Sequence, residues 1–355
     1  MKKKILISKI SQFGYHNAVT KYCKYLDKSK YEIHYAGFDL GWPKSEIEQV
    51  HVHYVPLFSN KIKRYWVYLK QVNRIIRKEN FDLLIIVDCQ ASLLIRLCNL
   101  FRKAVLDIRT GDVFLGEKYI STYNLMILFS SLFYKHIIIL SENLRQLLRL
   151  PTKKCSIVPL GAELLMLPDK TFEKLYLLYI GILDARNIYQ TIEGLAVFLE
   201  RNKHSNVEYN IVGYGQKSTE TKLRECIHHH GLDNIVIFHG RKNHNEISGI
   251  LEKSNVGVAY VPITKGYTCQ PTTKIYEYFL AGMPVIATKT KESAASVLPG
   301  YGVLIDDNPQ SFAMGIEEIL KNTHLYKSDL IKKSFDEYRW QNIIKNKLEP
   351  VLDKI

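Results

Sequence analysis

The chain has 355 residues, 46% of them hydrophobic, which is enough to fill two cores and more than a single core usually contains. Its formal net charge of +14 points to phosphate-rich partners, and its six cysteines include no CxxC pair, which argues for reduced thiols in the cytoplasm. The apolar stretch at residues 125–140 is interrupted by polar and basic side chains and falls short of a membrane span, so we expect a soluble chain.

In chain order, the first half alternates between short apolar runs and longer amphipathic segments. The predicted strands cover residues 5–8, 32–36, 50–55, 83–87, 104–108, 136–140 and 156–161. The predicted helices cover residues 17–26, 62–79 and 122–134. This order is typical of a parallel sheet that helices cover on both faces.

A second alternating series follows a predicted linker at residues 164–174. Its predicted strands cover residues 175–180, 207–212, 235–238, 256–259 and 284–287. Its predicted helices cover residues 188–200, 219–230, 245–253, 272–280 and 309–321, and residues 335–354 also have helical spacing. We therefore expect an α/β protein with two Rossmann-like, doubly wound parallel-sheet domains and a cleft between them. Ligands of such domains bind beyond the carboxyl ends of the strands.

The basic charge is concentrated in the first half of the chain. Residues 1–165 hold 26 Lys and Arg against 13 Asp and Glu, a net charge of +13, and the remaining residues have a net charge of +1. Two partners suit this charge: the anionic surface of a membrane, or nucleic acid. No helix-turn-helix, zinc or RNP motif accompanies the charge, so we expect no nucleic acid. A merely solvated basic face is the remaining interpretation.

The most informative segment is residues 271–287, which join a polar loop, a short helix, a Gly-x-Pro stop and an apolar strand. The N-terminus of that helix offers unpaired N–H groups that suit a diphosphate. Glu277, one turn into the helix, can accept hydrogen bonds from vicinal hydroxyls. The alternative interpretation is an ordinary helix-to-strand corner, which is frequent in α/β proteins.

Five segments together resemble a known family. Residues 179–186, 211–215, 232–240 and 271–287, with the region of Trp340, are similar in order and spacing to the GT-B glycosyltransferases of family 4, over about 180 residues. These are retaining enzymes that use nucleotide sugars, and the resemblance is to those of the bacterial surface-polysaccharide type. The resemblance implies domains at residues 1–163 and 175–334, and a C-terminal helix at residues 335–355 that crosses back to the first domain.

The resemblance also implies roles for particular residues. Arg186 and Lys274 would bind the donor diphosphate, Glu277 would bind the ribose hydroxyls, and Arg241 would border the base. Gly213 and Gly215 would let the backbone approach the nucleotide. The expected donor-binding residues are Gly14, Gly181, Arg186, Gly213, Gly215, Arg241, Thr268, Gln270, Thr272, Lys274 and Glu277.

Two positions depart from the family pattern. Cys269 stands where the family has a second glutamate that contacts the donor sugar, and Ile182 stands where an arginine follows the strand glycine. The sugar must therefore be held by other groups, such as Gln270, Thr272 and backbone N–H groups. These departures also admit a degenerate, non-catalytic member of the family.

The first domain supplies the catalytic candidates. Asp112, in a loop that resembles the Asp-Ile-Arg loop of surface-polysaccharide enzymes, is the leading candidate to orient or deprotonate the acceptor hydroxyl. Arg109 could stabilise the departing phosphate, and His16 is the other candidate base. The alternative is that Asp107, Arg109 and Asp112 form a structural ion-pair cluster. The three consecutive histidines at residues 228–230 point in different directions on a helix and are interpreted as a solvated helix end rather than a metal site.

The sequence therefore predicts sugar transfer, with retention, from a nucleoside diphosphate to an acceptor hydroxyl. The acceptor is expected to be a lipid-linked oligosaccharide, handled by a chain that binds peripherally to the inner face of the cell membrane in the cytoplasm. We expect no metal and no cofactor, because no Asp-x-Asp motif follows a predicted strand. Two alternatives remain: a non-catalytic GT-B binding subunit and a sugar-nucleotide epimerase.

Overall fold

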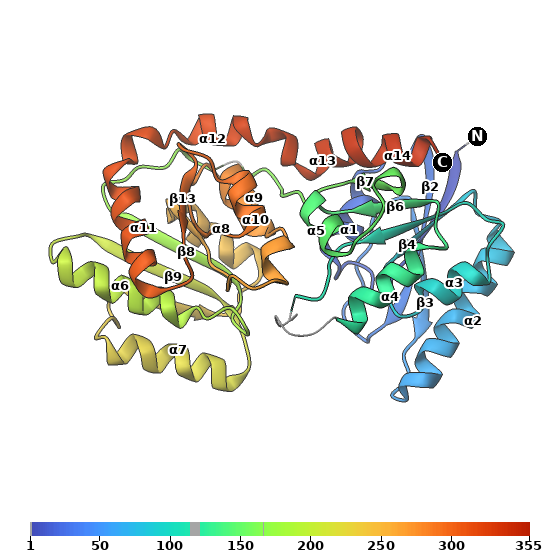
Figure 1. The fold of residues 1–355 in the computed structure, drawn as a ribbon, viewed down its shortest axis with the longest axis horizontal. Helices are drawn as coiled ribbons and strands as arrows, with labels where there is room; N and C mark the ends of the chain where they lie inside the picture. Colours follow the sequence, from blue (N-terminus) through green and yellow to red (C-terminus); the bar gives the residue numbers. More distant parts are fainter. Residues whose placement is uncertain (1, 114–120, 166) are drawn as a thin grey trace. The chain divides into compact units, whose positions relative to one another are not determined.

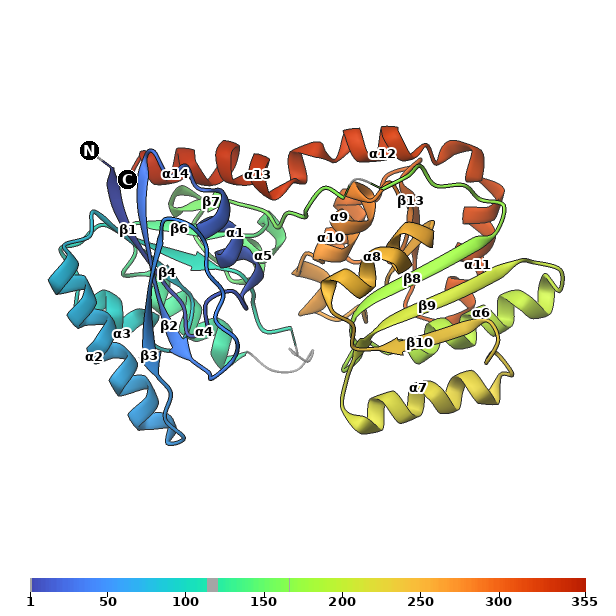
Figure 2. The same ribbon diagram turned by 180° about the vertical axis from the view of Figure 1, so that it is seen from behind.

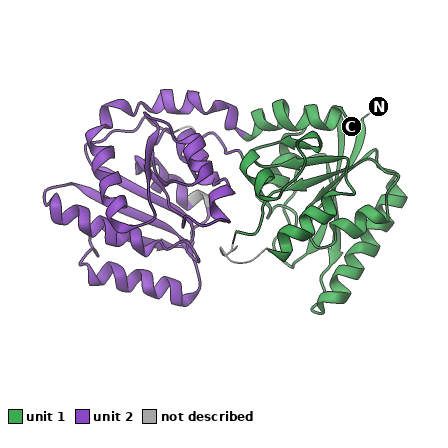
Figure 3. Cartoon of the chain, in the orientation of Figure 1, with its two compact units in different colours: residues 1–160, 340–355 green, residues 161–339 purple. Residues whose placement is uncertain are grey.

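The structure is a computed structural model that describes residues 2–113, 121–165 and 167–355 (Figure 1). The chain divides into two compact units. Unit 1 comprises residues 1–160 and 340–355, and unit 2 comprises residues 161–339 (Figure 3). Each unit is an open, parallel β-sheet with helices packed on it, as predicted.

Unit 1 contains a seven-stranded sheet in the order β3-β2-β1-β4-β5-β6-β7. Its strands are β1 (Lys3–Ser8), β2 (Tyr31–Asp39), β3 (Val50–Pro56), β4 (Leu83–Val87), β5 (Ala104–Ile108), β6 (His136–Ile139) and β7 (Cys155–Ile157). Its helices before residue 160 are α1 (Asn17–Tyr25), α2 (Lys61–Glu79), α3 (Ser92–Leu97), α4 (Thr122–Ser131) and α5 (Glu142–Leu147). All five residues of β4 are buried, because helices cover both faces of the central strands.

The last residues of the chain return to unit 1. Here α13 (Trp340–Ile343), a π-helical turn (Ile344–Leu348) and α14 (Glu349–Asp353) follow one another. Trp340 is buried, and the Glu349 carboxylate accepts a hydrogen bond from the Asp27 N–H at 2.9 Å. The sequence predicted helical spacing over residues 335–354, and the structure is helical over residues 340–353, with a separate 3₁₀ turn at Asp336–Tyr338 before it. Pro350 cannot donate the i→i−4 hydrogen bond, which explains the wider turn just before it.

Unit 2 contains a six-stranded sheet in the order β10-β9-β8-β11-β12-β13. Its strands are β8 (Leu175–Ile182), β9 (Val207–Tyr214), β10 (Val236–Gly240), β11 (Val256–Ala259), β12 (Val285–Thr288) and β13 (Gly302–Ile305). Its helices are α6 (Tyr189–Arg201), α7 (Lys217–His229), α8 (His244–Lys253), α9 (Thr273–Leu280), α10 (Lys291–Ser296), α11 (Pro309–Lys321) and α12 (Ser328–Ser334). Figure 2 shows β8, β9 and β10 side by side.

Both units have the strand order of a Rossmann fold, in which the connections reverse direction beside the first strand. In unit 2 this switch point lies between β8 and β11, and in unit 1 between β1 and β4. Ligands of doubly wound sheets bind at such points, outside the carboxyl ends of the strands. The loops after β8 and β11 are therefore the first place to examine.

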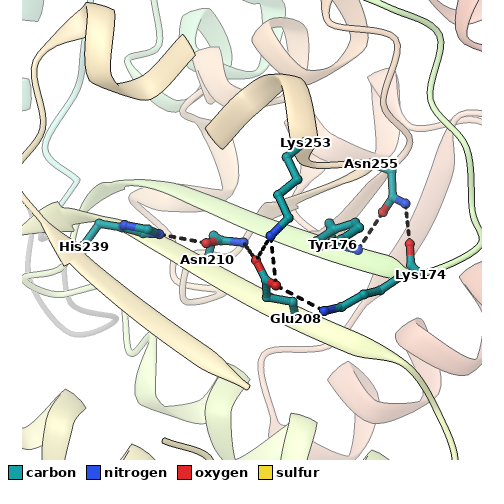
Figure 4. Close-up of polar contacts among 7 residues, drawn as sticks. All are labelled: Lys174, Tyr176, Glu208, Asn210, His239, Lys253 and Asn255. Carbon is teal, nitrogen blue, oxygen red and sulfur yellow. Dashed lines mark hydrogen bonds and ion pairs between the residues drawn. The ribbon is translucent and has the colours of Figure 1, made fainter. Parts of the chain in front are cut away.

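A polar network holds the amino-terminal half of the unit 2 sheet together (Figure 4). The Glu208 carboxylate accepts hydrogen bonds from the side chains of Lys253, Lys174 and Asn210, at 2.8, 3.2 and 3.0 Å. The Asn210 amide oxygen in turn lies 2.7 Å from Nε2 of His239. The network joins the residue before β8, the strands β9 and β10, and the end of α8. It therefore holds in place the strands whose carboxyl ends carry the loops of the candidate site.

None of the helices in the described part of the chain combines the length and the apolar character that crossing a bilayer requires.

Candidate functional site

The loop after β8 has an unusual backbone that fixes the position of Arg186. Ala185 and Asn187, on either side of it, both have left-handed conformations, with φ of 57° and 53°. The Asp184 carboxylate accepts hydrogen bonds from the Thr219 hydroxyl at 2.6 Å and from the Gln216 N–H at 3.0 Å. These hydrogen bonds lower the pKa of Asp184 and tie the loop to the start of α7.

Two glycines of this region are required by the protein's own packing. Gly213 pairs with Gly181 across β8 and β9, and a Cβ on Gly213 would lie 2.1 Å from the Gly181 carbonyl oxygen. A Cβ on Gly215 would lie 2.9 Å from an oxygen of Asp184. These close approaches account for both glycines without a ligand.

The loop after β11 supplies an aromatic platform for Arg186. Residues Tyr267–Cys269 form one 3₁₀ turn, and the Arg186 guanidinium lies over the buried Tyr267 ring, 4.5 Å from its centroid. The Thr268 hydroxyl accepts a hydrogen bond from the Lys291 N–H and so caps α10. Cys269 is buried, and burial raises the pKa of its thiol. The two loops at the switch point therefore meet through Arg186 and Tyr267.

The N-terminus of α9 follows directly. Its N-cap residue, Thr272, makes no side-chain capping hydrogen bond, so the first-turn N–H groups have no acceptor on that side chain. The Thr272 hydroxyl oxygen is itself buried and has no hydrogen-bond partner in the described structure. Lys274 and Glu277 form an ion pair with each other on the outer face of the helix. Partial positive charge, a lysine and a carboxylate thus lie within one helical turn.

Two further donor candidates have clear positions. Arg241 follows β10, and its guanidinium lies 4.9 Å from the centroid of the half-exposed Tyr214 ring at the end of β9. The Gln270 N–H donates to the carbonyl of Tyr267 and closes the 3₁₀ turn. In the sheet, β9 thus lies between β10, which Arg241 follows, and β8, whose loop carries Arg186.

The sequence did not indicate the cavity that lies between the β8 loop and α7. It encloses about 280 Å³. Its lining residues are Leu183, Ala185, Asn187, Ile188, Tyr189, Ser218, Thr219, Lys222 and Leu223. The lining includes both neighbours of Arg186. No sequence motif marks this cavity, because its walls come from two segments that only the fold brings together.

The first-unit candidates occupy the corresponding edge of their own sheet. Arg109 is buried, with Nε 2.6 Å from a carboxylate oxygen of Asp107 and an N–H group donating to the Val158 carbonyl. The Asp112 carboxylate accepts a hydrogen bond from the Ser121 hydroxyl at 2.6 Å. The alternative of a structural ion-pair cluster included an ion pair between Asp107 and Arg109, and the structure contains it. Asp112 has its own contact with Ser121.

His16 and Gly14 lie in the loop after β1. The His16 ring caps α1 by accepting a hydrogen bond from the Val19 N–H at 3.4 Å. Burial, together with the charges of Lys9 and Arg109, lowers the pKa of His16 to about 3, so the ring is neutral at pH 7. Gly14 has a φ of 92°, and a Cβ there would lie 2.2 Å from Oγ of Ser45.

Asp88 is a candidate that the sequence analysis missed. It follows β4 directly at the switch point of unit 1, and burial raises its pKa. Its carboxylate accepts a hydrogen bond from the Tyr123 hydroxyl at 2.9 Å. The signal available in the sequence was an aspartate immediately after a run of five apolar residues, Leu83–Val87.

Comparisons with known proteins identify the fold. Residues 174–322 match the family model described as "Glycosyl transferases group 1". Over 99% of its length, the chain superimposes on sucrose-phosphate synthase from Thermosynechococcus elongatus, with a TM-score of 0.78, 14% identity and 99% coverage of that chain. The fold is GT-B.

Two further GT-B structures are similar to the chain over 99% of its length. The HepE protein of Anabaena, in complex with UDP and glucose, has a TM-score of 0.77 and 14% identity, with 100% of that chain covered. The lipopolysaccharide outer core galactosyltransferase WaaB, in its apo form, has a TM-score of 0.72 and 12% identity, with 100% of that chain covered. No curated protein sequence matches the chain. Within the GT-B fold, the family model covers the part of the chain that carries Arg186, Lys274 and Glu277.

Proposed function

We propose that the chain is a glycosyltransferase that moves a sugar from a nucleoside diphosphate to an acceptor hydroxyl. The observation that carries the proposal is the start of α9. There an N-terminus without a side-chain cap adjoins a lysine and a carboxylate, inside the segment that matches the family model. These are the three groups that a diphosphate followed by a ribose needs.

The donor would bind along the switch point of unit 2. Arg186, which lies over the Tyr267 ring, would contact the diphosphate with two N–H groups, and the first-turn N–H groups of α9 would provide further hydrogen bonds to it. Lys274 would leave Glu277 for the phosphate, which frees the carboxylate for the ribose hydroxyls. The Anabaena structure contains UDP and glucose, so a UDP sugar is the first donor to test.

The sugar subsite would lack the second carboxylate of the family. The buried Cys269 occupies its position, and the hydroxyl of Thr268 already caps α10. Thr272 has a buried hydroxyl oxygen without a partner, and it would hold a hydroxyl or phosphate oxygen of the donor.

The proposed reaction follows the retaining course of family 4. The bond between the anomeric carbon and the diphosphate oxygen breaks, the acceptor oxygen forms the new bond on the same face, and the acceptor proton leaves to a base. Arg186, Lys274 and the α9 N-terminus would stabilise the leaving diphosphate, so no metal is required. Asp112 is the proposed base, because Nδ1 of His16 already accepts the Val19 N–H and caps α1.

The acceptor would be a lipid-linked glycan of bacterial surface-polysaccharide synthesis, met at the cytoplasmic face of the membrane. Two features of unit 1 support this. A groove of about 660 Å³ along α2 is lined by Trp66 and several basic residues. Those basic residues are Lys70, Arg74, Arg77 and Lys78. On α4, Leu125 and Phe129 are both about half exposed, which suits an anionic and partly apolar surface.

Nucleotide binding tests the donor site. A thermal-shift series with UDP, GDP, ADP and CMP and their sugar conjugates should show stabilisation by one base, because ligand at about a hundredfold excess over Kd contributes roughly 2.7 kcal/mol. Arg186→Ala should abolish the shift. Arg224→Ala is the matched control, because Arg224 also lies over an aromatic ring of unit 2, that of Phe238, but on α7. A shift that survives Arg186→Ala and disappears in the control would reject the site.

A non-catalytic binding subunit is the second candidate, and the buried Cys269 favours it. Incubation of the folded chain with the stabilising nucleotide sugar separates the two. An enzyme should release the nucleoside diphosphate slowly by hydrolysis and faster with a glycolipid acceptor. A subunit should bind the donor, or a partner protein, without turnover.

A further inference from the structure

A second group of chemically reactive side chains lies in unit 1, at the edge of the sheet that is opposite the catalytic candidates. Glu32 and His34 lie near the start of β2, and His51 and His53 lie near the start of the edge strand β3. The register of the parallel pair sets His34 beside His51. Because side chains alternate between the two faces of a strand, all four residues lie on one face.

Three of these residues bring their ligand atoms together. One side-chain nitrogen or oxygen atom from each of Glu32, His34 and His51 lies within 4.8 Å of the other two. A tetrahedral Zn²⁺ site with bonds of about 2 Å holds its ligand atoms roughly 3.3 Å apart, so modest side-chain rotations would close the site. His51 is exposed, with its ring centroid 4.6 Å from that of His34, whereas His34 is only 4% exposed. The buried His34 ring is thus held in place, whereas a side-chain rotation can bring the exposed His51 ring to an ion.

The orientation of His34 is set by its neighbours. Its Nε2 lies 2.9 Å from Oε1 of Glu32, and its Nδ1 lies 2.8 Å from Nε2 of His53. The Phe81 ring packs edge-on against the same imidazole, with 5.0 Å between the centroids. A metal on Nε2 requires the proton on Nδ1, and His53 is placed to accept that proton's hydrogen bond. Such partners for the other ring nitrogen accompany almost all metal-binding histidines.

Lys4 is the one cation that contacts the group in the described part of the chain. Its ammonium lies 3.2 Å from Oε1 of Glu32 and 2.9 Å from Oε2 of Glu79. Both contacts of the Glu32 carboxylate use Oε1, so a metal can be ligated through Oε2 while Lys4 keeps its contact with Glu79. The lysine therefore lowers the affinity without occupying the position of the ion.

We propose that Glu32, His34 and His51 bind a divalent transition-metal ion such as Zn²⁺. Two imidazoles and a carboxylate suit Zn²⁺ and its first-row neighbours far better than Mg²⁺ or Ca²⁺, which prefer oxygen ligands. His53 is a positioning residue that acts through His34. The ion would join the edge strand β3 to β2, and its role would be structural, because the site is at the amino ends of the strands. This site is independent of the nucleotide-sugar site in unit 2.

The test is Zn²⁺ binding by the full chain, with its affinity tag removed and metals stripped by a chelator. Isothermal titration with ZnCl₂ should give one ion per chain, and Zn²⁺ should raise the melting temperature. His51→Ala should weaken binding at least tenfold, and Glu32→Gln provides a second variant if the first folds poorly. Binding that is absent in the wild type, or equally strong in both variants, would overturn the proposal.

Two controls sharpen the result. Replacing the exposed histidines at 228–230 by alanine should leave the affinity unchanged, and a loss there would move the site to α7 and overturn the proposal. His53→Ala should weaken binding about 10- to 100-fold, whereas His53→Gln, which keeps an acceptor for the Nδ1–H of His34, should restore most of it. If His53 only packed against His34, the Zn²⁺ affinities of the His53→Ala and His53→Gln variants would be equal. Nucleotide shifts should not change when the chain is stripped of metal.

Discussion

The ammonium group of Lys274 and the carboxylate of Glu277 neutralise each other in the first turns of α9. The two side chains are 31% and 32% exposed, so separating them costs little. A bound diphosphate would attract the lysine and a ribose would occupy the carboxylate. The diphosphate and the ribose would then each take one member of the same ion pair, which couples recognition of the phosphate to recognition of the ribose.

Lys274→Ala should therefore weaken nucleoside-diphosphate binding about 10- to 100-fold, the worth of one or two charge-assisted hydrogen bonds. The free energy of unfolding should hardly change. Isothermal titration of the variant measures the loss, and Lys321→Ala, at the exposed end of α11, is the control. Equal affinities in the two variants would remove Lys274 from the donor site.

The Tyr267 ring should matter for binding because it holds Arg186. Tyr267→Phe keeps the ring and should bind nucleotide nearly as well as the wild type. Tyr267→Ala removes the platform, and the loss of a cation–π contact worth about 0.5–2 kcal/mol should weaken binding several-fold. The ring is buried, so melting temperatures must accompany the affinities. Comparable affinity of the Ala and Phe variants would mean that Arg186 is positioned by its backbone alone.

The Glu208 network should make stability depend on acid pH. Burial alone would raise the pKa of Glu208, but hydrogen bonds from Lys253, Asn210 and Lys174 lower it to about 2. Because the folded pKa is below the ordinary value of 4.5, the contribution is present above pH 4.5 and disappears as the pH falls towards 2. Glu208→Gln should cost about 1–3 kcal/mol at pH 7. Denaturant unfolding should show the gap between variant and wild type narrowing below pH 4.5, and a gap that is independent of pH would contradict the assignment.

Asp112→Asn should lower turnover about 10²- to 10⁴-fold while donor binding stays unchanged, because it removes the proposed base and keeps the shape of the side chain. Ser121→Ala, which removes the hydrogen bond to Asp112 and the α4 capping bond from the Asn124 N–H but keeps the Asp112 carboxylate, should have a much smaller effect. Steady-state rates with a glycolipid acceptor measure both. Unchanged turnover in Asp112→Asn, with a large loss in His16→Asn, would transfer the role to His16.

Much of the fold could be predicted, because long apolar runs such as residues 175–180 and 83–87 identify buried strands on their own. Several short elements were missed, although β11 and β12, also four residues long, were predicted. The helix α10 and the strand β13 have six and four residues, which is too few for a periodic pattern, and their structure depends on packing against neighbours.

The contacts of the site could be predicted only where both residues lie in one short segment of the chain. Lys274 and Glu277 are three residues apart, so their pairing follows from helical spacing. The contact of Arg186 with Tyr267 joins two loops that are distant in the sequence. The group of Glu32, His34 and His51 depends on the register of β2 with β3, and a slip of one residue would turn each side chain to the other face. A single sequence contains no signal for that register.

The division of the chain into units also sets an order of assembly. Unit 2 is one continuous stretch, residues 161–339, whereas unit 1 is made of residues 1–160 and 340–355. During translation, the strands of unit 1 are synthesised first, but its α13 and α14 are synthesised only after the whole of unit 2. Until then Asp27 lacks the carboxylate of Glu349, and the surface that Trp340 will cover is open to chaperones and proteases. The unit whose synthesis begins first is therefore the unit that is completed last.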